Sequence, residues 1–481
     1  MTGPRLGVAA GPRPGVAAGP RPGVAAGPRL GVVADDVTGA CDLADAVRDA
    51  GGSAVVVLGA PAPGLDLPPC DAAVVALRTR TAPAAQAVAE SVAAASWLRD
   101  RGASAVYQKY CSTFDSTDDG TIGPVADALL DLLGPGAVSV GTPATPRAGR
   151  TQYQGHLFVG DRLLSESPLR HHPLTPMTDP DLVRVLGRQT PRGVGLLPWG
   201  ALRGPDAGAA LARVVDDGVA HVLVDALTDE DLDALARVVG AGNGGGGAAG
   251  TEPARIGSAG AGTAGIGSGA PRVDGRPVLL GGAAGFAAAL ARSWASGAAE
   301  PADVPAPRAS RGRALIVSGS CSARTREQVD RFPGPRVPLD ADALAADPDG
   351  ALAAVLDALR AAYADGPGPV LVSSSADPDA VRGTQERLGV RRAAAVLERT
   401  AGEVAARAVR DLGVGRLLVA GGETSGAVAS ALGLGVLRVG PAAAPGAPWM
   451  VPVDGPAVAV LLKSGNFGDP DLFTTAWEAC P

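Results

Sequence analysis

Lysine is almost absent from this sequence of 481 residues. Of its 42 basic residues, only Lys109 and Lys463 are lysines, and all the others are arginines. The bias toward alanine, glycine, arginine and proline is typical of a GC-rich genome, in which arginine replaces lysine wherever either residue serves. Because a planar guanidinium cannot replace a compact ammonium group at every site, the two remaining lysines are candidates for functional positions.

Aromatic residues are also scarce, at 3% of the chain. Apolar residues still make up 46%, so full cores are expected, built from alanine, valine and leucine. The sequence has no run of about 20 apolar residues free of charge and turn formers, which argues against a membrane-spanning helix. Its N-terminal region has arginines but no apolar stretch of the kind found in secretory signal peptides.

The cysteines do not form the pattern of a disulfide-rich protein. There are five of them, an odd number, they are widely spaced, and no CxxC pair occurs. Free thiols are typical of reducing compartments, so the sequence predicts a cytoplasmic protein.

An excess of positive charge is missing as well. The formal net charge is −7 and the isoelectric point is near 5.3. Because neutralising nucleic-acid phosphates requires a basic surface, a nucleic-acid partner is not expected. A small anionic ligand is still compatible with this negative net charge, because a local cluster of side chains can be positive while the whole chain is negative.

Segments of low complexity separate the regions expected to fold. Residues 3–30 repeat an eight-residue unit rich in proline and glycine, so residues 1–26 are predicted to be a disordered tail. Residues 241–271 are almost all glycine, alanine and serine and are predicted to be a flexible insertion. Their GxGxxG pattern at 260–265 follows no strand, which argues against a dinucleotide site. Residues 297–312, rich in alanine and proline, are predicted to be a linker.

Elsewhere short apolar strands alternate with helices, which is typical of parallel α/β sheets. Strands are expected at 30–34, 53–59, 72–77, 104–110, 137–144, 221–226, 276–282, 314–320 and 369–375, and at the starts of segments 416–432 and 457–468. Helices are expected at 42–50, 84–100, 123–133, 229–239, 324–332 and 393–412. The pattern predicts two α/β domains, 27–296 and 313–481, each with a mainly parallel sheet flanked by helices, and an active site in the cleft between them.

Two adjacent carboxylates, Asp35 and Asp36, follow the first expected strand. Ligands of open α/β sheets bind beyond the carboxyl ends of the strands. Paired carboxylates at such a place could take a proton from a hydroxyl group or hold a metal ion, so both are candidate catalytic residues. The structural alternative is that one of them is the N-cap of the next helix.

Further polar residues follow the next strands and are candidates for binding an anionic, polyhydroxylated substrate. Guanidinium groups suit a carboxylate, and a lysine beside hydroxyl and carboxylate groups suits a sugar. The candidates are Lys109, Asp115, Ser116, Arg147, Arg150 and His156. Taken singly, the arginines are more often surface residues, and His171-His172 is more often a loop than a metal site. The sequence leaves the metal ligands unassigned.

The second domain offers three glycine-rich strand ends. Gly421–Gly426 lies between a strand and a helix, where backbone N–H groups and the helix N-terminus bind phosphate. The segments 318–320 and 463–468 end two other strands, and a lysine beside glycines can hold polyphosphate. The sequence is not a Walker A motif, because neither lysine follows a glycine. The alternative is that these are three ordinary turns.

Six motifs together resemble the four-carbon acid sugar kinase family. They are VADDVTGACDLA, KYCSTFDSTDDGTIGP, PATPRAGRTQYQGHLFVGDRLLSES, HHPLTPMTD, GGETSGAV and LLKSGNFG, and several of them are similar to the family's 3-oxo-tetronate kinase branch. The resemblance covers about residues 28–475 except the insertion. It implies an N-terminal domain that binds the sugar acid and a C-terminal domain that binds ATP. The nucleotide-binding positions that it implies are Ser320, Gly422, Glu423, Thr424, Ser425 and Gly465.

The sequence therefore predicts an ATP-dependent kinase that converts 3-oxo-tetronate to its 4-phosphate. Asp35 or Asp36 would orient or deprotonate the hydroxyl group, Lys109 and two arginines would hold the carboxylate, and the glycine turns would hold the triphosphate with Mg²⁺. A kinase for threonate or erythronate is an alternative, and so is a non-catalytic sensor of a sugar acid or nucleotide. The expected partners are small molecules, and the oligomeric state is left open, a homo-oligomer included.

Overall fold

The computed structural model describes residues 27–171, 175–241, 270–295, 312–374 and 378–481. The predicted tail lies outside the described residues, as does the GxGxxG pattern. The predicted insertion and linker lie outside them too, apart from a few residues at their edges.

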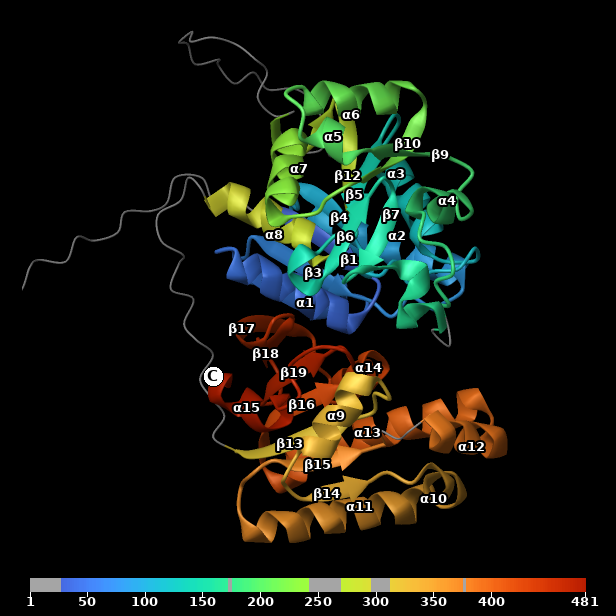
Figure 1. The fold of residues 1–481 in the computed structure, drawn as a ribbon. Helices are drawn as coiled ribbons and strands as arrows, with labels where there is room; N and C mark the ends of the chain where they lie inside the picture. Colours follow the sequence, from blue (N-terminus) through green and yellow to red (C-terminus); the bar gives the residue numbers. More distant parts are fainter. Residues whose placement is uncertain (1–26, 172–174, 242–269, 296–311, 375–377) are drawn as a thin grey trace, which may run out of the picture.

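The N-terminal half consists of alternating strands and helices (Figure 1). Its strands are β1 (Leu30–Ala34), β2 (Ala54–Leu58), β3 (Ala72–Ala76), β4 (Ala105–Lys109), β5 (Val138–Thr142), β6 (Arg150–Tyr153), β7 (His156–Val159), β8 (Arg162–Leu163), β9 (Gly193–Leu197), β10 (Val219–Val224), β11 (Arg272–Val273) and β12 (Arg276–Gly282). Its helices are α1 (Val37–Asp49), α2 (Ala84–Asp100), α3 (Ile122–Leu133), α4 (Leu182–Gly187), α5 (Trp199–Leu202), α6 (Ala207–Asp216), α7 (Asp229–Ala241) and α8 (Ala284–Ala295), with 3-10 turns η1 (Pro146–Ala148), η2 (Leu164–Glu166) and η3 (Pro168–His171).

The main sheet of this half is parallel, in the order β2-β3-β1-β4-β12-β5-β10-β9. Side chains of β1 alternate between the two faces: Val32 lies in the core on one face and Val33 in the core on the other. Both faces are covered by helices, which explains why these strands are apolar throughout. Because β1 lies between β3 and β4, the loops that follow these three strands meet at one edge of the sheet.

The C-terminal half begins at β13 and has a second parallel set of strands. Its strands are β13 (Arg313–Ser318), β14 (Arg336–Pro338), β15 (Val370–Ser373), β16 (Val414–Ala420), β17 (Val436–Ala444), β18 (Ala447–Pro452) and β19 (Ala459–Lys463). Its helices are α9 (Ala323–Arg331), α10 (Ala341–Ala346), α11 (Pro348–Ala362), α12 (Pro378–Leu388), α13 (Val390–Leu412), α14 (Gly422–Ala431) and α15 (Leu472–Thr475), with 3-10 turns η4 (Tyr363–Asp365) and η5 (Ala476–Ala479). The parallel order is β14-β15-β13-β16-β19, so the loops after β13, β16 and β19 are also neighbours.

The antiparallel hairpin β17–β18 joins the two halves, a feature that the sequence analysis did not predict. β18 pairs with β19, and β17 pairs with β2 of the N-terminal half, so the sheet continues from one half to the other. Helix α1 lies at this boundary and contacts β17, β18, β19 and α14 (Figure 1). The predicted α/β class with two mainly parallel sheets is confirmed, and the hairpin fuses the two sheets at their edges.

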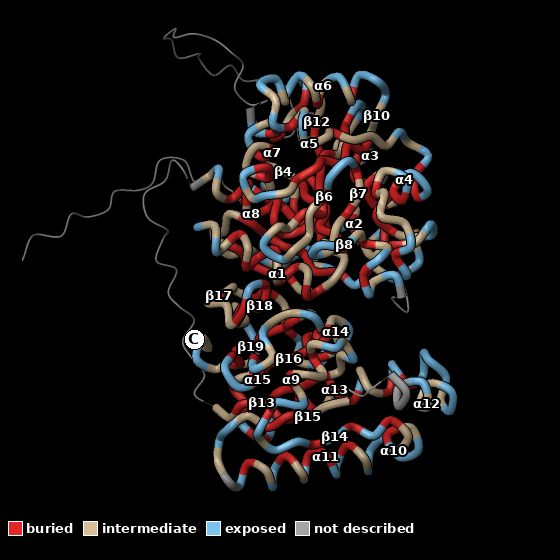
Figure 2. The backbone as a smooth tube through the Cα atoms, viewed as in Figure 1, coloured by how far each residue is buried: buried red, intermediate tan, exposed pale blue. Residues whose placement is uncertain are grey.

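The cores contain mostly alanine, valine and leucine, as the composition predicts, and Figure 2 shows the buried segments concentrated along the strands. Among the few large aromatic side chains, Tyr107, Phe286 and Trp449 are fully buried. All five cysteines are free. Within the described part of the chain, no helix has both the length and the apolarity needed to cross a bilayer.

Candidate active site

Asp35 and Asp36 lie at the carboxyl end of β1 and share one arginine. Arg80, in the loop after β3, donates from Nη2 to Asp35 Oδ1 at 2.8 Å and to Asp36 Oδ1 at 2.7 Å, and from Nε to Asp35 Oδ2 at 2.9 Å. Burial opposes the ionisation of Asp36, but Arg80, Lys109 and local hydrogen bonds outweigh it and lower the pKa of the carboxyl. Asp36 is therefore ionised at neutral pH.

Asp36 is also the N-cap of α1, as the structural alternative proposed. Its Oδ1 accepts from Gly39 N at 2.9 Å, and its Oδ2 accepts from Thr38 Oγ1 at 2.7 Å. Because the cap lies directly after the strand, α1 starts at Val37 and not at Asp42 as expected. Capping fixes the orientation of the carboxylate at the sheet edge, which a reacting group also requires.

Lys109 ends β4 and lies beside this carboxylate. The residue is 2% exposed, and its Nζ donates to Tyr110 O at 2.9 Å. A Cβ added at Gly39 would lie 2.9 Å from Lys109 Nζ, so glycine at that position leaves room for the ammonium group. The charge of Lys109 also helps to lower the pKa of Asp36. The first of the two lysines thus belongs to the same charged cluster as the paired aspartates.

The loop after β4 carries the candidates Asp115 and Ser116. Asp115 accepts from Thr113 Oγ1 at 2.6 Å and from Cys111 Sγ at 3.0 Å, while the buried Ser116 Oγ accepts from Gln189 Nε2 at 2.8 Å. Burial and Asp115 raise the pKa of the Cys111 thiol to about 12, against the opposing charges of Arg80 and Lys109. The influence of the Arg80 and Lys109 charges on Cys111 shows that this loop lies next to the aspartate cluster.

The remaining candidates of the N-terminal half lie in different surroundings. Arg147 is exposed and pairs with Asp49 at 3.0 Å and with Asp229 at 2.9 Å. Asp49 and Asp36 lie at opposite ends of α1, about 20 Å apart along the helix, so the Arg147 guanidinium lies at the end far from Asp36. The structure therefore does not bring Arg147 to the aspartate cluster.

Arg150 and His156 belong to the small antiparallel sheet β6-β7-β8. Arg150 donates to Ala148 O, and its buried Nε has no hydrogen-bond partner among the residues that the structure describes. The guanidinium is close enough to Asp42 of α1 to oppose the rise in that carboxyl's pKa. His156 Nδ1 is 2.7 Å from Gln154 O. Arg150 thus has a free donor near α1, whereas His156 is bonded locally.

In the C-terminal half, the three predicted phosphate segments meet. A Cβ added at Gly465, after β19, would collide with Ser320 Oγ, which follows β13. A Cβ at Gly421, after β16, would lie 3.2 Å from Ser320 N, and Gly421 has a φ of 122° that favours glycine. A Cβ at Gly319 would collide with Thr424 Oγ1. The glycines therefore let three strand ends approach closely around the N-terminus of α14, where the first N–H groups have no partner within the helix.

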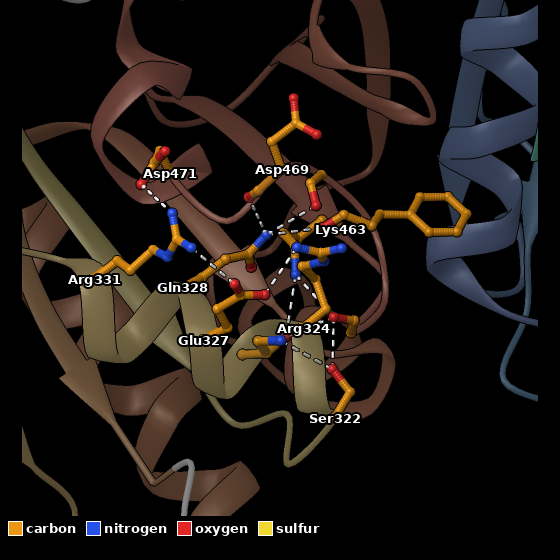
Figure 3. Close-up of polar contacts among 12 residues, drawn as sticks. Ser322, Arg324, Glu327, Gln328, Arg331, Lys463, Asp469 and Asp471 are labelled. Carbon is orange, nitrogen blue, oxygen red and sulfur yellow. Dashed lines mark hydrogen bonds and ion pairs between the residues drawn. The ribbon is translucent and has the colours of Figure 1, made fainter. Parts of the chain in front are cut away.

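Lys463 lies beneath these turns and is fully buried. Its Nζ donates to Thr325 Oγ1 at 3.2 Å and to Gly465 O at 3.3 Å. Ser322 Oγ and Thr325 Oγ1 each donate to Gly465 O at 2.7 Å, which ties the start of α9 to the loop after β19 (Figure 3). Burial, together with the charge of Arg324, lowers the pKa of Lys463 to about 7. The second lysine thus stabilises the loop after β19 through its hydrogen bond to Gly465 O.

The two sets of residues face each other across the domain boundary. A Cβ added at Gly422 would lie 3.8 Å from both Asp36 Oδ2 and Thr38 Oγ1. On the same boundary, Gly446 N of the β17–β18 turn donates to Asp45 Oδ2 of α1 at 3.0 Å. An acidic sheet edge and a phosphate-binding type of helix start therefore lie side by side, as transfer of a phosphoryl group to a hydroxyl requires.

Sequence reasoning missed two arginines at this boundary, Arg78 and Arg80. Both follow β3, the strand next to β1, and the rule that ligands bind at strand ends applies to that loop as well. Arg80 joins the two aspartates, and Arg78 pairs with Glu423 and Glu398 of the C-terminal half.

Comparisons with known proteins agree with this division. A family model of a sugar-binding N-terminal domain matches residues 30–264, and one of a nucleotide-binding C-terminal domain matches residues 315–473. The 3-oxo-tetronate kinase of Burkholderia multivorans is 43% identical over 93% of this chain and 96% of its own length, and that of Cupriavidus necator is 42% identical over 92% and 95%. A solved Salmonella typhimurium LT2 structure, 35% identical, has a TM-score of 0.76 and covers 94% of this chain and 99% of its own.

Proposed function

This chain belongs to the family of 3-oxo-tetronate kinases, with a sugar-binding N-terminal domain and a nucleotide-binding C-terminal domain, and we propose that it phosphorylates a 3-oxo-tetronate with ATP. The terminal hydroxyl oxygen forms a bond to the γ-phosphorus of ATP, the bond from that phosphorus to ADP breaks, and the hydroxyl proton is released. The products are the 4-phosphate and ADP. The observation that carries the proposal is the approach of Asp36 to Gly422.

On the acceptor side, we assign the hydroxyl group to Asp35 and Asp36. A carboxylate whose pKa is lowered is a weak base, so Asp36 suits orienting the hydroxyl group and accepting its proton late in the reaction. Lys109 and the free Nε of Arg150 are suited to the substrate carboxylate, because both are buried donors near α1. Asp115 and Ser116, in the loop after β4, would complete the sugar pocket.

On the nucleotide side, the phosphates of ATP would lie on Ser320, the Gly422–Ser425 turn and Gly465. Backbone N–H groups at the start of α14 and its dipole favour negative charge there. Positioning of this kind supplies most of the catalysis in phosphoryl transfer, because little covalent chemistry is left to the protein.

Mg²⁺ fits this site as a partner of ATP. The described residues contain no group of three or more side chains able to hold a metal ion by themselves. Mg²⁺ is commonly held by one or two carboxylates together with substrate phosphates, and Glu423 and Asp36 are the carboxylates at the turn. Bound there, the ion would neutralise charge on the transferred phosphate.

The test is ADP release by the full chain across a panel of 3-oxo-tetronates, threonate and erythronate. We expect turnover with a 3-oxo-tetronate, a 4-phosphate product by phosphorus NMR, and loss of turnover in Asp36→Asn. Turnover with threonate or erythronate alone would favour the alternative substrate. ATP binding without ADP release on any acceptor would indicate a sensor, although a sensor would need only one of the two facing sites.

A further inference from the structure

Arg78 is a residue of the N-terminal half whose side chain lies on helix α14 of the C-terminal half. Its guanidinium donates to Glu423, the second residue of α14, and to Glu398 Oε2 of α13 at 3.4 Å. Burial opposes the charge on Arg78, but Glu423 and Glu398 outweigh it and raise the pKa of the guanidinium. The two glutamates thus hold a permanent cation at the domain boundary.

Glycine at position 426 makes this contact sterically feasible. A Cβ added at Gly426 would lie 2.9 Å from Arg78 Cδ, 3.0 Å from its Nε and 3.3 Å from its Cζ. Gly422, four residues earlier on the same helix face, is the residue that faces Asp36. Asp36 and Arg78 therefore flank the first turn of α14, where the proposed function places the phosphates.

We propose that Arg78 is a further catalytic residue: in the ATP-bound protein its guanidinium leaves Glu423 and donates to the transferring phosphoryl group. The inference rests on the proposed function. Phosphoryl transfer spreads negative charge over the equatorial oxygens of the phosphorus, and a guanidinium fork matches two of them. Arg78 exchanges hydrogen bonds only and gives up no proton, since its guanidinium stays charged.

Both side chains of the Arg78–Glu423 pair are partly exposed, which lets the guanidinium move from Glu423 to a phosphoryl group. The Arg78 side chain is 44% exposed, and the Glu423 side chain is 59% exposed, so their pair is easily exchanged for another anion. Arg80, two residues away in the same loop, holds Asp35 and Asp36. One loop would thus position the acceptor carboxylates through Arg80 and the donor phosphate through Arg78.

A purely structural role would be a latch between the domains. Loss of a latch would weaken ATP and ADP equally, because both nucleotides occupy the same turn. A contact to the transferring group instead affects ATP, which has that group, and spares ADP, which lacks it.

The experiment compares ATP and ADP affinities of the full chain by calorimetry, together with kcat, for wild type, Arg78→Ala and Arg78→Lys. Losing a charged hydrogen bond should weaken ATP by about 10-fold or more in Arg78→Ala and leave ADP within about 2-fold. The kcat should fall by about 100-fold or more. Arg78→Lys should recover part of the ATP affinity but little of the rate, because an ammonium lacks the fork.

Arg276→Ala is the matched control. Arg276 pairs with Asp216 on the surface and begins β12, whereas the site lies at the carboxyl ends of the strands. This variant should behave as wild type. If ATP and ADP weaken equally, or if kcat is unchanged in both Arg78 variants, the proposal is overturned. Absence of turnover in the wild type would contradict the proposed function. Because nucleotide binding needs no acceptor, the comparison of ATP and ADP affinities would still test the role of Arg78.

Discussion

Lys463 offers a sharp test, because its ammonium group is buried and forms no ion pair with a carboxylate of the described residues. The side chain is 0% exposed, and its hydrogen bonds go to Thr325 Oγ1 and Gly465 O. Burial, with a smaller contribution from the charge of Arg324, lowers the pKa from 10.5 to about 7. Below pH 7 the native state therefore carries a charge that is solvated better in the unfolded state, and this destabilises the fold.

The sign of the pH dependence follows from proton binding. Between pH 7 and 10.5 the unfolded state binds more protons than the native state, so stability should rise with pH. The full shift corresponds to about 5 kcal/mol at pH 6. Lys463→Met removes this penalty and loses two hydrogen bonds worth about 1 kcal/mol each, so the variant should be about 3 kcal/mol more stable at pH 6. Its stability should fall below that of wild type above about pH 9.

Lys463→Arg is the matched counterpart, because an arginine stays charged at every accessible pH. It should be less stable than wild type throughout and should show no rise in stability between pH 7 and 10. Denaturant unfolding of the three proteins at pH 6, 8 and 10 measures the difference, with the buried Trp449 and its partly buried neighbour Trp477 as a fluorescence signal. Parallel curves for wild type and Lys463→Met would refute the claim that this ammonium group is desolvated.

Three other predictions concern the boundary. Asp36→Asn should lower kcat by about 100-fold or more while ATP affinity stays within about 3-fold. Because the pKa of Asp36 is lowered, the loss of wild-type rate caused by its protonation should occur at a lower pH than for an ordinary aspartate, and steady-state pH profiles check both expectations. Gly465→Ala should raise KM for ATP by about 10-fold, because its Cβ collides with Ser320 Oγ, whereas Gly208→Ala, whose Cβ meets nothing within 4 Å, should leave kinetics unchanged. Burial raises the pKa of Asp45 to about 6, so this carboxylate reduces stability increasingly as pH rises from 4 to 6, and Asp45→Asn should raise Tm at pH 8 but not at pH 4; equal shifts at both pH values would contradict this.

Much of the fold and part of the site follow from local sequence. Helix α2 occurs at its predicted bounds, and β1, β4 and β16 lie where short apolar runs predict them. The position of polar residues at strand ends also follows from local sequence, because a polar segment that follows a buried strand must lie at the edge of the sheet. For that reason Asp36 and Lys109 could be assigned to one edge, and the glycine turns to another, from the residues alone.

The tertiary structure decided which strand ends meet. β1 lies between β3 and β4, and this order, set by long-range pairing, brings Arg80 to the aspartates. Arg147 looked equivalent to Arg150 in the sequence, yet Asp49 and Asp229 hold it at the far end of α1.

The sequence predicted a site between the two halves but not the contacts that join them. The hairpin β17–β18 pairs with β2, more than 370 residues earlier in the chain, and so sets Gly422 against Asp36 and Arg78 against Glu423. Hydrophobic periodicity and turn residues report what one segment does locally. Which surfaces of two domains come together depends on side chains from distant segments, and that information lies only in the folded protein.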